Sequence, residues 1–202
     1  MTDKTAIYVH GLGSGAASTT VDIVRKFFKE YEWTAVEVNE DPYDSVSIIN
    51  REIEYLHPAM LMGTSLGGLY LMYADMSLCE DDAVRFIFNP ACNIARDIRE
   101  KIGFGVKEYF VPRHDAIQHY ELNEEVCIRF DDFIATQHPT PGKGRDYAMF
   151  SIHDELIGPA GILHNEGICF KAGYRILIDS EGNHRLRKAT LKQAKAIIGL
   201  NP

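Results

Sequence analysis

The stretch Gly63-Thr64-Ser65-Leu66-Gly67 joins two segments of different character. The apolar residues 59–62 before it are typical of a buried strand, and residues 66–76 after it are typical of a helix. A Gly-x-Ser-x-Gly turn between a strand and a helix pushes the serine hydroxyl out of the sheet, because the two glycines leave room for a sharp bend. The pattern predicts Ser65 as a nucleophile, although a tight turn without chemistry would share this sequence.

Apolar and β-branched runs recur on both sides of this turn and alternate with helix-like segments. Such alternation predicts an α/β fold with a doubly wound, mainly parallel six-stranded sheet in the order 2-1-3-4-5-6 and helices on both faces. The predicted strands are residues 5–10, 34–38, 59–62, 84–88, 147–152 and 174–178. The predicted helices are residues 17–31, 45–56, 66–77, 159–169 and 188–198.

The alternation breaks at residues 91–145, which separate the fourth and fifth predicted strands. A connection of this length exceeds an ordinary crossover, so we expect an insertion that forms a cap or lid on a single domain spanning residues 1–202. Within it, residues 121–135 are predicted to be helical and residues 137–144 to be a loop. Its aromatic residues either line an apolar pocket or simply pack: Phe104, Tyr109, Phe110, Tyr120, Phe130 and Phe133.

The composition of the chain argues against several classes of function. The formal net charge of -8 argues against nucleic acid as a partner. No run of apolar residues is long enough to span a membrane, and the amino terminus leads into a predicted strand without a signal peptide. The cysteines show neither CxxC spacing nor the density of a disulfide framework. We therefore expect a cytoplasmic protein with buried free thiols, and the oligomeric state stays open.

Serine needs a base to accept its proton and an acid to orient that base. Asp154 comes just after the fifth predicted strand, and His184 comes shortly after the sixth. The carboxyl ends of parallel strands share one edge of the sheet, so these side chains are expected to meet Ser65 there. The order serine, acid, histidine along the chain is that of the α/β-hydrolase arrangement.

Other residues compete for two of these roles. Glu155 and Asp179 are alternatives to Asp154, but an acid directly after the fifth strand suits the expected position best. The alternatives to His184 are His10, His153 and His164. A histidine base must be unprotonated at rest, so hydrolytic activity is predicted to fall in acid.

The glycine-rich turn His10-Gly11-Leu12-Gly13-Ser14-Gly15 follows the first predicted strand. In the predicted strand order, the turns after strands one and three flank the point where the connections reverse direction. The backbone amides of Leu12 and Leu66 are therefore predicted to form an oxyanion hole. His10, Gly11 and Gly13 are expected to contact the substrate.

Several segments together resemble the small α/β hydrolases, and more narrowly the YqiA-type esterases of the UPF0227 group. They are the first strand with His10-Gly11, residues 63–68, Asn89-Pro90, Asp154-Glu155, and Gly182-Asn183-His184. The resemblance is loosest over residues 91–145, and His153 stands where that group usually has glycine. It implies hydrolysis of carboxylic esters through an acyl-enzyme, without a cofactor or metal, on a small-molecule acyl ester of small or medium size.

Two interpretations from other classes remain open on the sequence. Gly11-x-Gly13-x-x-Ala16 also fits a relaxed dinucleotide-binding fingerprint, with Glu37 as the acid for a ribose hydroxyl. A hydrolase-like scaffold can also serve as a non-catalytic binding module. A further pattern, His114-Asp115 with His119, is too sparse to predict a metal site.

Overall fold

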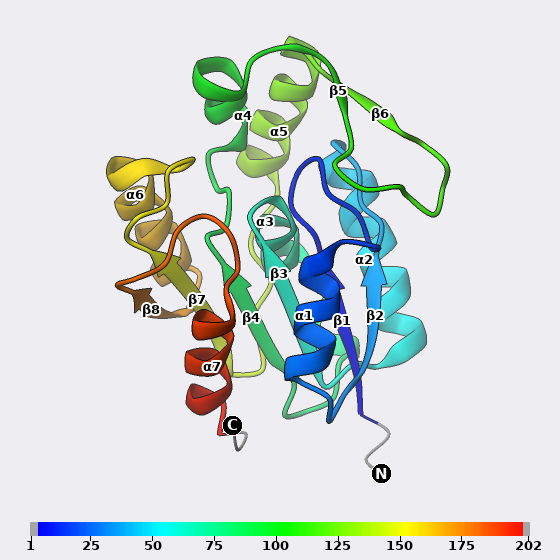
Figure 1. Ribbon diagram of the computed structural model, residues 1–202, viewed down its shortest axis with the longest axis vertical. Coiled ribbons are helices and arrows are strands. Elements are labelled where there is room, and N and C mark those ends of the chain that lie inside the picture. The colour runs from blue at the N-terminus through cyan, green and yellow to red at the C-terminus, as the bar shows by residue number, and fades with distance from the viewer. Residues whose placement is uncertain (1–3, 200–202) are drawn as a thin grey trace.

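The computed structural model describes residues 4–199, which contain a six-stranded parallel sheet (Figure 1). Its strand order is β2-β1-β3-β4-β7-β8, so the predicted order and fold class are confirmed. All five pairings are parallel, which brings the carboxyl ends of the strands to one edge. The strands are β1 (Thr5–Val9), β2 (Glu32–Val36), β3 (Met60–Thr64), β4 (Val84–Phe88), β7 (Asp146–Ser151) and β8 (Arg175–Asp179).

Helices cover both faces of this sheet. On one face α1 (Thr19–Phe27) and α7 (Lys188–Ile197) pack on a cluster that includes Phe86 and Met149. On the other face lie α2 (Pro42–Leu56), α3 (Leu66–Tyr73) and α6 (Gly158–Lys171). Strands buried on both faces are expected to be largely apolar, and β4 is fully buried with Arg85 as its one charged residue.

Most predicted boundaries differ from the observed ones by a few residues. The predicted second strand, residues 34–38, lies two residues beyond β2. The predicted helix 45–56 starts three residues earlier, because Asp41 caps α2 by accepting hydrogen bonds from the amides of Tyr43 and Asp44. The predicted helix 66–77 ends at Tyr73 and is followed by a separate 3-10 turn at Met76–Leu78.

The long connection between β4 and β7 contains more regular structure than the sequence predicted. It starts with α4 (Ile94–Asp97) and a π-helical turn at Ile98–Ile102. An antiparallel pair follows, β5 (Gly105–Glu108) and β6 (His119–Leu122), and it projects beside the carboxyl end of the sheet (Figure 1). The predicted helix 121–135 is present as α5 (Glu124–Thr136).

A buried arginine fixes the point at which this connection returns to the sheet. Arg85 on β4 is fully buried, and its Nε lies 2.6 Å from Asp146 Oδ1 on β7. Its other nitrogens donate to Leu71 O and to both oxygens of Thr140. A buried guanidinium needs such a full set of acceptors, so residues near Thr140 are held at the amino-terminal half of the sheet.

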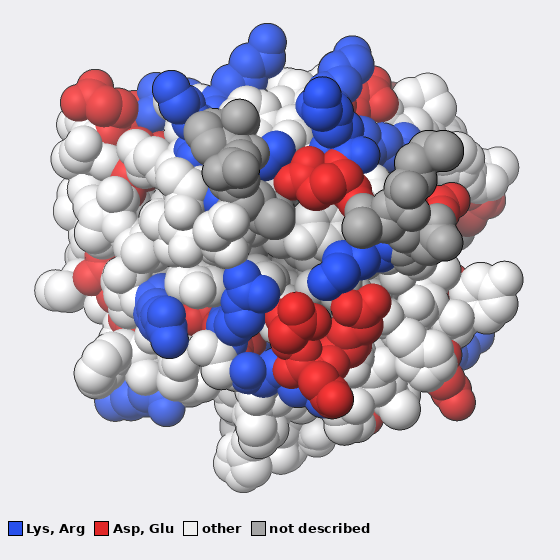
Figure 2. Space-filling view, turned by 90° about the horizontal axis from the view of Figure 1, so that it is seen from below, with Lys and Arg blue, Asp and Glu red and all other residues white. Residues whose placement is uncertain are grey.

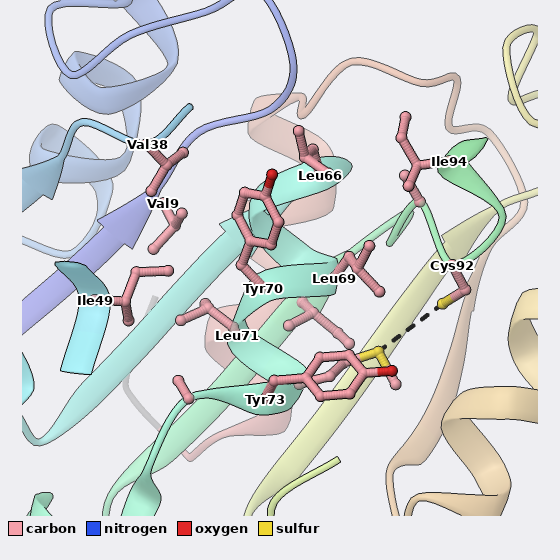
Figure 3. Close-up of a cluster of buried hydrophobic side chains, with 14 of the residues drawn as sticks. Val9, Val38, Ile49, Leu66, Leu69, Tyr70, Leu71, Tyr73, Cys92 and Ile94 are labelled. Carbon is pink, nitrogen blue, oxygen red and sulfur yellow. Dashed lines mark hydrogen bonds between the residues drawn. The ribbon is translucent and has the colours of Figure 1, made fainter. Parts of the chain in front are cut away.

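The core on the α3 face reaches the turn that carries Ser65. Figure 3 shows buried side chains on both sides of α3. Val9 and Val38 lie on the side of Tyr70, and Cys92 and Ile94 lie on the side of Leu69. Every residue of α3 is buried, in keeping with a helix that is apolar on all sides. Tightly packed side chains therefore support the turn before α3, and such packing can hold a strained backbone conformation in place.

The face at the amino-terminal ends of the strands carries mixed charge. Figure 2 shows basic and acidic side chains interspersed on it. Ion pairs such as Lys4–Glu80 and Lys143–Asp81 join segments at this end. No helix within residues 4–199 is long and apolar enough to cross a bilayer.

Candidate active site

Ser65 lies on a strained turn at the carboxyl end of β3. Its φ of 51° and ψ of -117° are unusual for a residue with a side chain. A Cβ on Gly63 would lie 2.7 Å from Gly67 O, and a Cβ on Gly67 would clash with the carbonyl oxygens of Val9 and His10. Both glycines are therefore required for the bend, as the pattern predicted.

Backbone hydrogen bonds hold this turn against the segment that follows β4. Ser65 N donates to Phe88 O over 2.9 Å, and Ala91 N donates to Ser65 O over 3.1 Å. The Ser65 hydroxyl itself makes no hydrogen bond within residues 4–199. Rigid backbone support beneath a free hydroxyl suits a nucleophile.

The glycine-rich turn after β1 passes directly beside Ser65. A Cβ on Gly11 would lie 3.1 Å from Ser65 Cβ and 3.7 Å from Ser65 Oγ, so only glycine lets the two backbones approach this closely. The amides of Leu12 and Leu66 donate no backbone hydrogen bond in the turns of the described chain. Both are thus left for an oxygen of a bound molecule, although their role as an oxyanion hole stays a prediction.

The structure brings Asp154 and His184 into direct contact. His184 Nδ1 lies 2.7 Å from Asp154 Oδ2, and the Asp154 side chain is fully buried. Asp154 Oδ1 accepts from the amides of Leu156 and Ile157, so the carboxylate is fixed in place. An ionised carboxylate accepts only, so Nδ1 carries the proton and Nε2 is left as the basic nitrogen. That nitrogen belongs to a side chain that is still 15% exposed.

The two competing acids have other partners. Glu155 Oε2 accepts from the backbone amide of His184 over 3.1 Å, and hydrogen bonds from its own amide and that of His184 lower the pKa of its carboxyl. Asp179 is buried and accepts from Thr190 Oγ1 at 2.5 Å. Neither carboxylate touches the His184 ring, so the geometry favours Asp154 as its partner.

His10 and Gly13 are both packed inside the protein. The buried His10 ring uses Nδ1 on Gly11 O and Nε2 on Val38 N, so both nitrogens are engaged there. A Cβ on Gly13 would lie 2.8 Å from Tyr120 Oη and 3.0 Å from the Phe110 ring, because the insertion covers this residue. The expected contacts of His10, Gly11 and Gly13 with substrate stay a prediction.

A buried ionic cluster ties the insertion to the glycine-rich turn. Glu37, just past β2, lies 3.3 Å from His10 Nε2 and 3.4 Å from Arg113 Nη1, and it accepts from His114 N. Arg113 also donates to Val38 O, and Phe110 N donates to Gly13 O over 2.7 Å. The glutamate of the dinucleotide interpretation is therefore engaged by the protein itself.

The Glu37 cluster predicts a pH dependence of stability. Burial alone raises the pKa of Glu37, but the neighbouring His10 ring, hydrogen bonds from the amides of His114 and Ala16, and the charge of Arg113 outweigh it, so the pKa falls below that of an ordinary glutamate. At pH values above the pKa of this glutamate in the unfolded chain, the Glu37 carboxylate therefore stabilises the fold. The contribution is lost as the pH falls through the lower pKa of Glu37 in the folded protein.

We expect Glu37→Gln to melt at a lower temperature than the wild type near neutral pH, and the two melting temperatures to converge in acid. Thermal melts between pH 7 and pH 3 measure this. The matched control is Glu54→Gln, which changes an exposed glutamate on α2. A constant difference between Glu37→Gln and the wild type across the range would show that the carboxylate contributes nothing as a charge.

Sequence reasoning assigned no role to the residues that connect these parts, above all Asn89, which it named only within the family resemblance, and Arg113. Asn89 has a positive φ of 43° and is buried, and an asparagine directly after a strand is a signal for such a backbone. Arg113 gave no signal, because an isolated arginine in a polar loop is ordinarily solvated.

The residues that suggested a metal set are dispersed. Asp115 is bound by Arg113, and His119 faces Glu108 across the β5–β6 pair. Among residues 4–199, no group of three or more histidine, cysteine, aspartate or glutamate side chains is arranged to hold a metal ion. The four cysteines are buried free thiols.

A cavity of about 270 Å³ lies next to the acid loop. It is bounded by Asn93 and Arg96 on one side and by Leu156 and Ile157 on the other. Glu155, which accepts a hydrogen bond from His184 N, lines it as well, but neither Ser65 nor His184 does.

Comparisons with solved structures show the same fold in proteins of very different sequence. The mouse alpha/beta hydrolase domain-containing protein 10 is 12% identical, with a TM-score of 0.65 over 98% of this chain and 90% of that one. A monoacylglycerol lipase of Paleococcus ferrophilus is 14% identical, with a TM-score of 0.62 over 97% and 95%. Est1E of Butyrivibrio proteoclasticus is 13% identical, with a TM-score of 0.60 over 97% and 85%.

No curated protein matches the sequence. The model of one family does, described as "Uncharacterised protein family (UPF0227)", and it covers residues 5–198. The match spans the sheet, the insertion and the residues around Ser65, Asp154 and His184, in agreement with the resemblance seen in the sequence. With its α/β-hydrolase fold, the chain belongs to the UPF0227 family.

Proposed function

We propose that the protein is a serine hydrolase that cleaves carboxylic esters through an acyl-enzyme. The observation that carries the proposal is the 2.7 Å contact between His184 Nδ1 and Asp154 Oδ2, at the same sheet edge as the strained turn of Ser65. A buried carboxylate on one nitrogen of an imidazole prepares the other nitrogen to take a proton from an alcohol. The Ser65 hydroxyl lies at that edge and makes no hydrogen bond within the described chain, so it is free to take His184 as its partner.

In the proposed reaction, Ser65 Oγ attacks the acyl carbon while His184 Nε2 takes the hydroxyl proton. The imidazolium formed is stabilised by Asp154, and its proton passes to the oxygen of the departing alcohol. Water then attacks the acyl-enzyme, with His184 as base again, and releases the acid and free Ser65. The negative charge of each tetrahedral intermediate falls on the former carbonyl oxygen, for which the Leu12 and Leu66 amides are the proposed donors.

The proposed substrate is a small or medium carboxylic ester, as the family resemblance implies. The cavity of about 270 Å³ does not set the size of this ester, because neither Ser65 nor His184 lines it. Several proteins of the same fold are described as esterases or lipases. No cofactor takes part in the proposed reaction.

The test is hydrolysis of p-nitrophenyl esters of increasing acyl length by the wild type, Ser65→Ala and Ser47→Ala. Ser47 is an exposed serine on α2 and serves as the control. We expect the wild type and Ser47→Ala to hydrolyse short and medium esters with an initial burst of p-nitrophenol equal to the enzyme concentration, and Ser65→Ala to show no burst. Equal turnover by Ser65→Ala and the wild type would reject the proposal.

A further inference from the structure

We propose that Asn89 is a positioning residue that fixes the place of the His184 loop relative to the Ser65 turn. The inference rests on the proposed function, since it assigns the alignment of that same site. Asn89 is the residue after β4 and is only 4% exposed. It lies between the two parts of the site that come from distant segments of the chain.

The side chain of Asn89 joins three backbone groups around the site. Its Oδ1 accepts from Ser151 N at 2.8 Å, and Ser151 is the last residue of β7. Its Nδ2 lies 3.2 Å from Asn183 O and 3.4 Å from His184 O, and 3.3 Å from Ser151 Oγ. The amide donor at Ser151 fixes which end of the side chain is oxygen, so Nδ2 must point to the His184 loop.

The backbone around Asn89 holds the nucleophile turn. Phe88 O, on the preceding residue, accepts from Ser65 N, and Ala91 N donates to Ser65 O. Asn89 N donates to Met149 O of β7. The segment after β4 therefore holds the Ser65 turn through its backbone and the His184 loop through the side chain of Asn89.

Asparagine fits this place better than any other residue type. A φ of 43° is tolerated by asparagine and glycine and costs other residues energy. The site also requires an acceptor atom and a separate donor atom on one short side chain. The aspartate carboxylate at neutral pH only accepts, and serine has a single hydroxyl for both roles. Removing the amide would leave the partly buried carbonyls of Asn183 and His184 without this donor.

The consequence concerns rate more than binding. His184 makes its contact with Asp154 through the ring, while Asn89 and Glu155 hold its backbone oxygen and nitrogen. Loss of one backbone support allows the ring to shift relative to Ser65. A misplacement of about 1 Å can cost about 100-fold in rate when the reacting groups no longer align.

The experiment compares Asn89→Asp and Asn89→Gly with the wild type. Asn89→Asp keeps the shape and the acceptor for Ser151 N but loses the donor to the His184 loop. Asn89→Gly keeps the positive φ and loses both. The matched control is His57→Gly, which changes an exposed residue with the same φ of 43° at the end of α2, near the amino-terminal edge of the sheet.

We expect both Asn89 variants to lose about 10- to 100-fold in kcat, with KM within about 2-fold of the wild type. Inactivation by a fluorophosphonate should slow by a similar factor, and Asn89→Asp should retain a cooperative thermal melt. His57→Gly should keep the wild-type kcat even if its melting temperature falls.

Two results overturn the inference. A folded Asn89→Asp with wild-type kcat and wild-type inactivation rate would show that the donor to the His184 loop does not align the site. A loss confined to KM or to the melting temperature would assign Asn89 to binding or to stability alone. Failure of the proposed function looks different, because then the wild type itself would show no turnover and no Ser65-dependent inactivation.

Discussion

Replacing Ser65 by alanine is expected to lower kcat for ester hydrolysis by about 10⁴- to 10⁶-fold, and His184→Ala is expected to cause a loss of similar size. The double variant should be no slower than either single one. The physical reason is that attack by Ser65 Oγ and proton transfer to His184 Nε2 form one step, so that removing either group removes the whole step. Steady-state rates of the three variants, purified in parallel, measure this.

The informative control is the melting temperature of each variant. Ser65 keeps its backbone contacts with Phe88 and Ala91 when the hydroxyl is removed, so Ser65→Ala should remain folded. Losses that multiply in the double variant would mean that the two side chains act independently, and the proposed proton transfer would then be wrong.

The second large effect is expected from Asp154→Asn, with a loss of about 10⁴-fold in kcat. An asparagine amide can donate to His184 Nδ1, which would move the ring proton to Nε2 and leave no base facing Ser65. The matched control is Glu155→Gln, because the amide oxygen of glutamine can still accept from His184 N. We expect Glu155→Gln to lose less than about 10-fold.

Rates of both variants at neutral pH decide between the neighbouring acids. If Glu155→Gln were the slower enzyme, Glu155 would be the acid of the site and the contact between Asp154 and His184 would be structural. Equal small losses would mean that no carboxylate assists the histidine.

The order of strands could be predicted because each one is a short apolar run between polar segments. In β4, for example, every residue is buried, and its sequence predicts its bounds to the residue. The bounds of α2 were less accurate, since Asp41 and Pro42 extend the helix beyond its apolar pattern. Local capping chemistry decides such ends, and hydrophobic periodicity does not contain it.

Parallel topology made the candidate site predictable. Ser65, Asp154 and His184 each follow a different strand of the sheet, so the strand order alone brings their backbones to one edge. The sequence favoured Asp154 over Glu155 by its place directly after the fifth strand, but adjacent residues in a loop point in different directions. Only the structure shows which carboxylate meets the imidazole.

The insertion was beyond prediction for a physical reason. Three of the four residues of β5 are exposed, so no apolar alternation marks this strand, and its pairing with β6 is a contact across a long loop. Arg113 is buried against Glu37 and Val38, which follow β2. A charged residue in a sequence ordinarily indicates a position exposed to solvent, so this burial could not be predicted. Asn89 carried a local backbone signal, but its contacts with Ser151 and His184 depend on tertiary structure.

The most direct test of a Ser65 nucleophile is the site of covalent attachment of a fluorophosphonate. Intact-mass and peptide mass spectrometry of the labelled protein should show one adduct per chain, on the peptide that contains Ser65. The adduct should be absent from Ser65→Ala, formed much more slowly by His184→Ala, and unchanged in Ser47→Ala. An adduct on any other residue, or labelling of Ser65→Ala at the wild-type rate, would contradict the account.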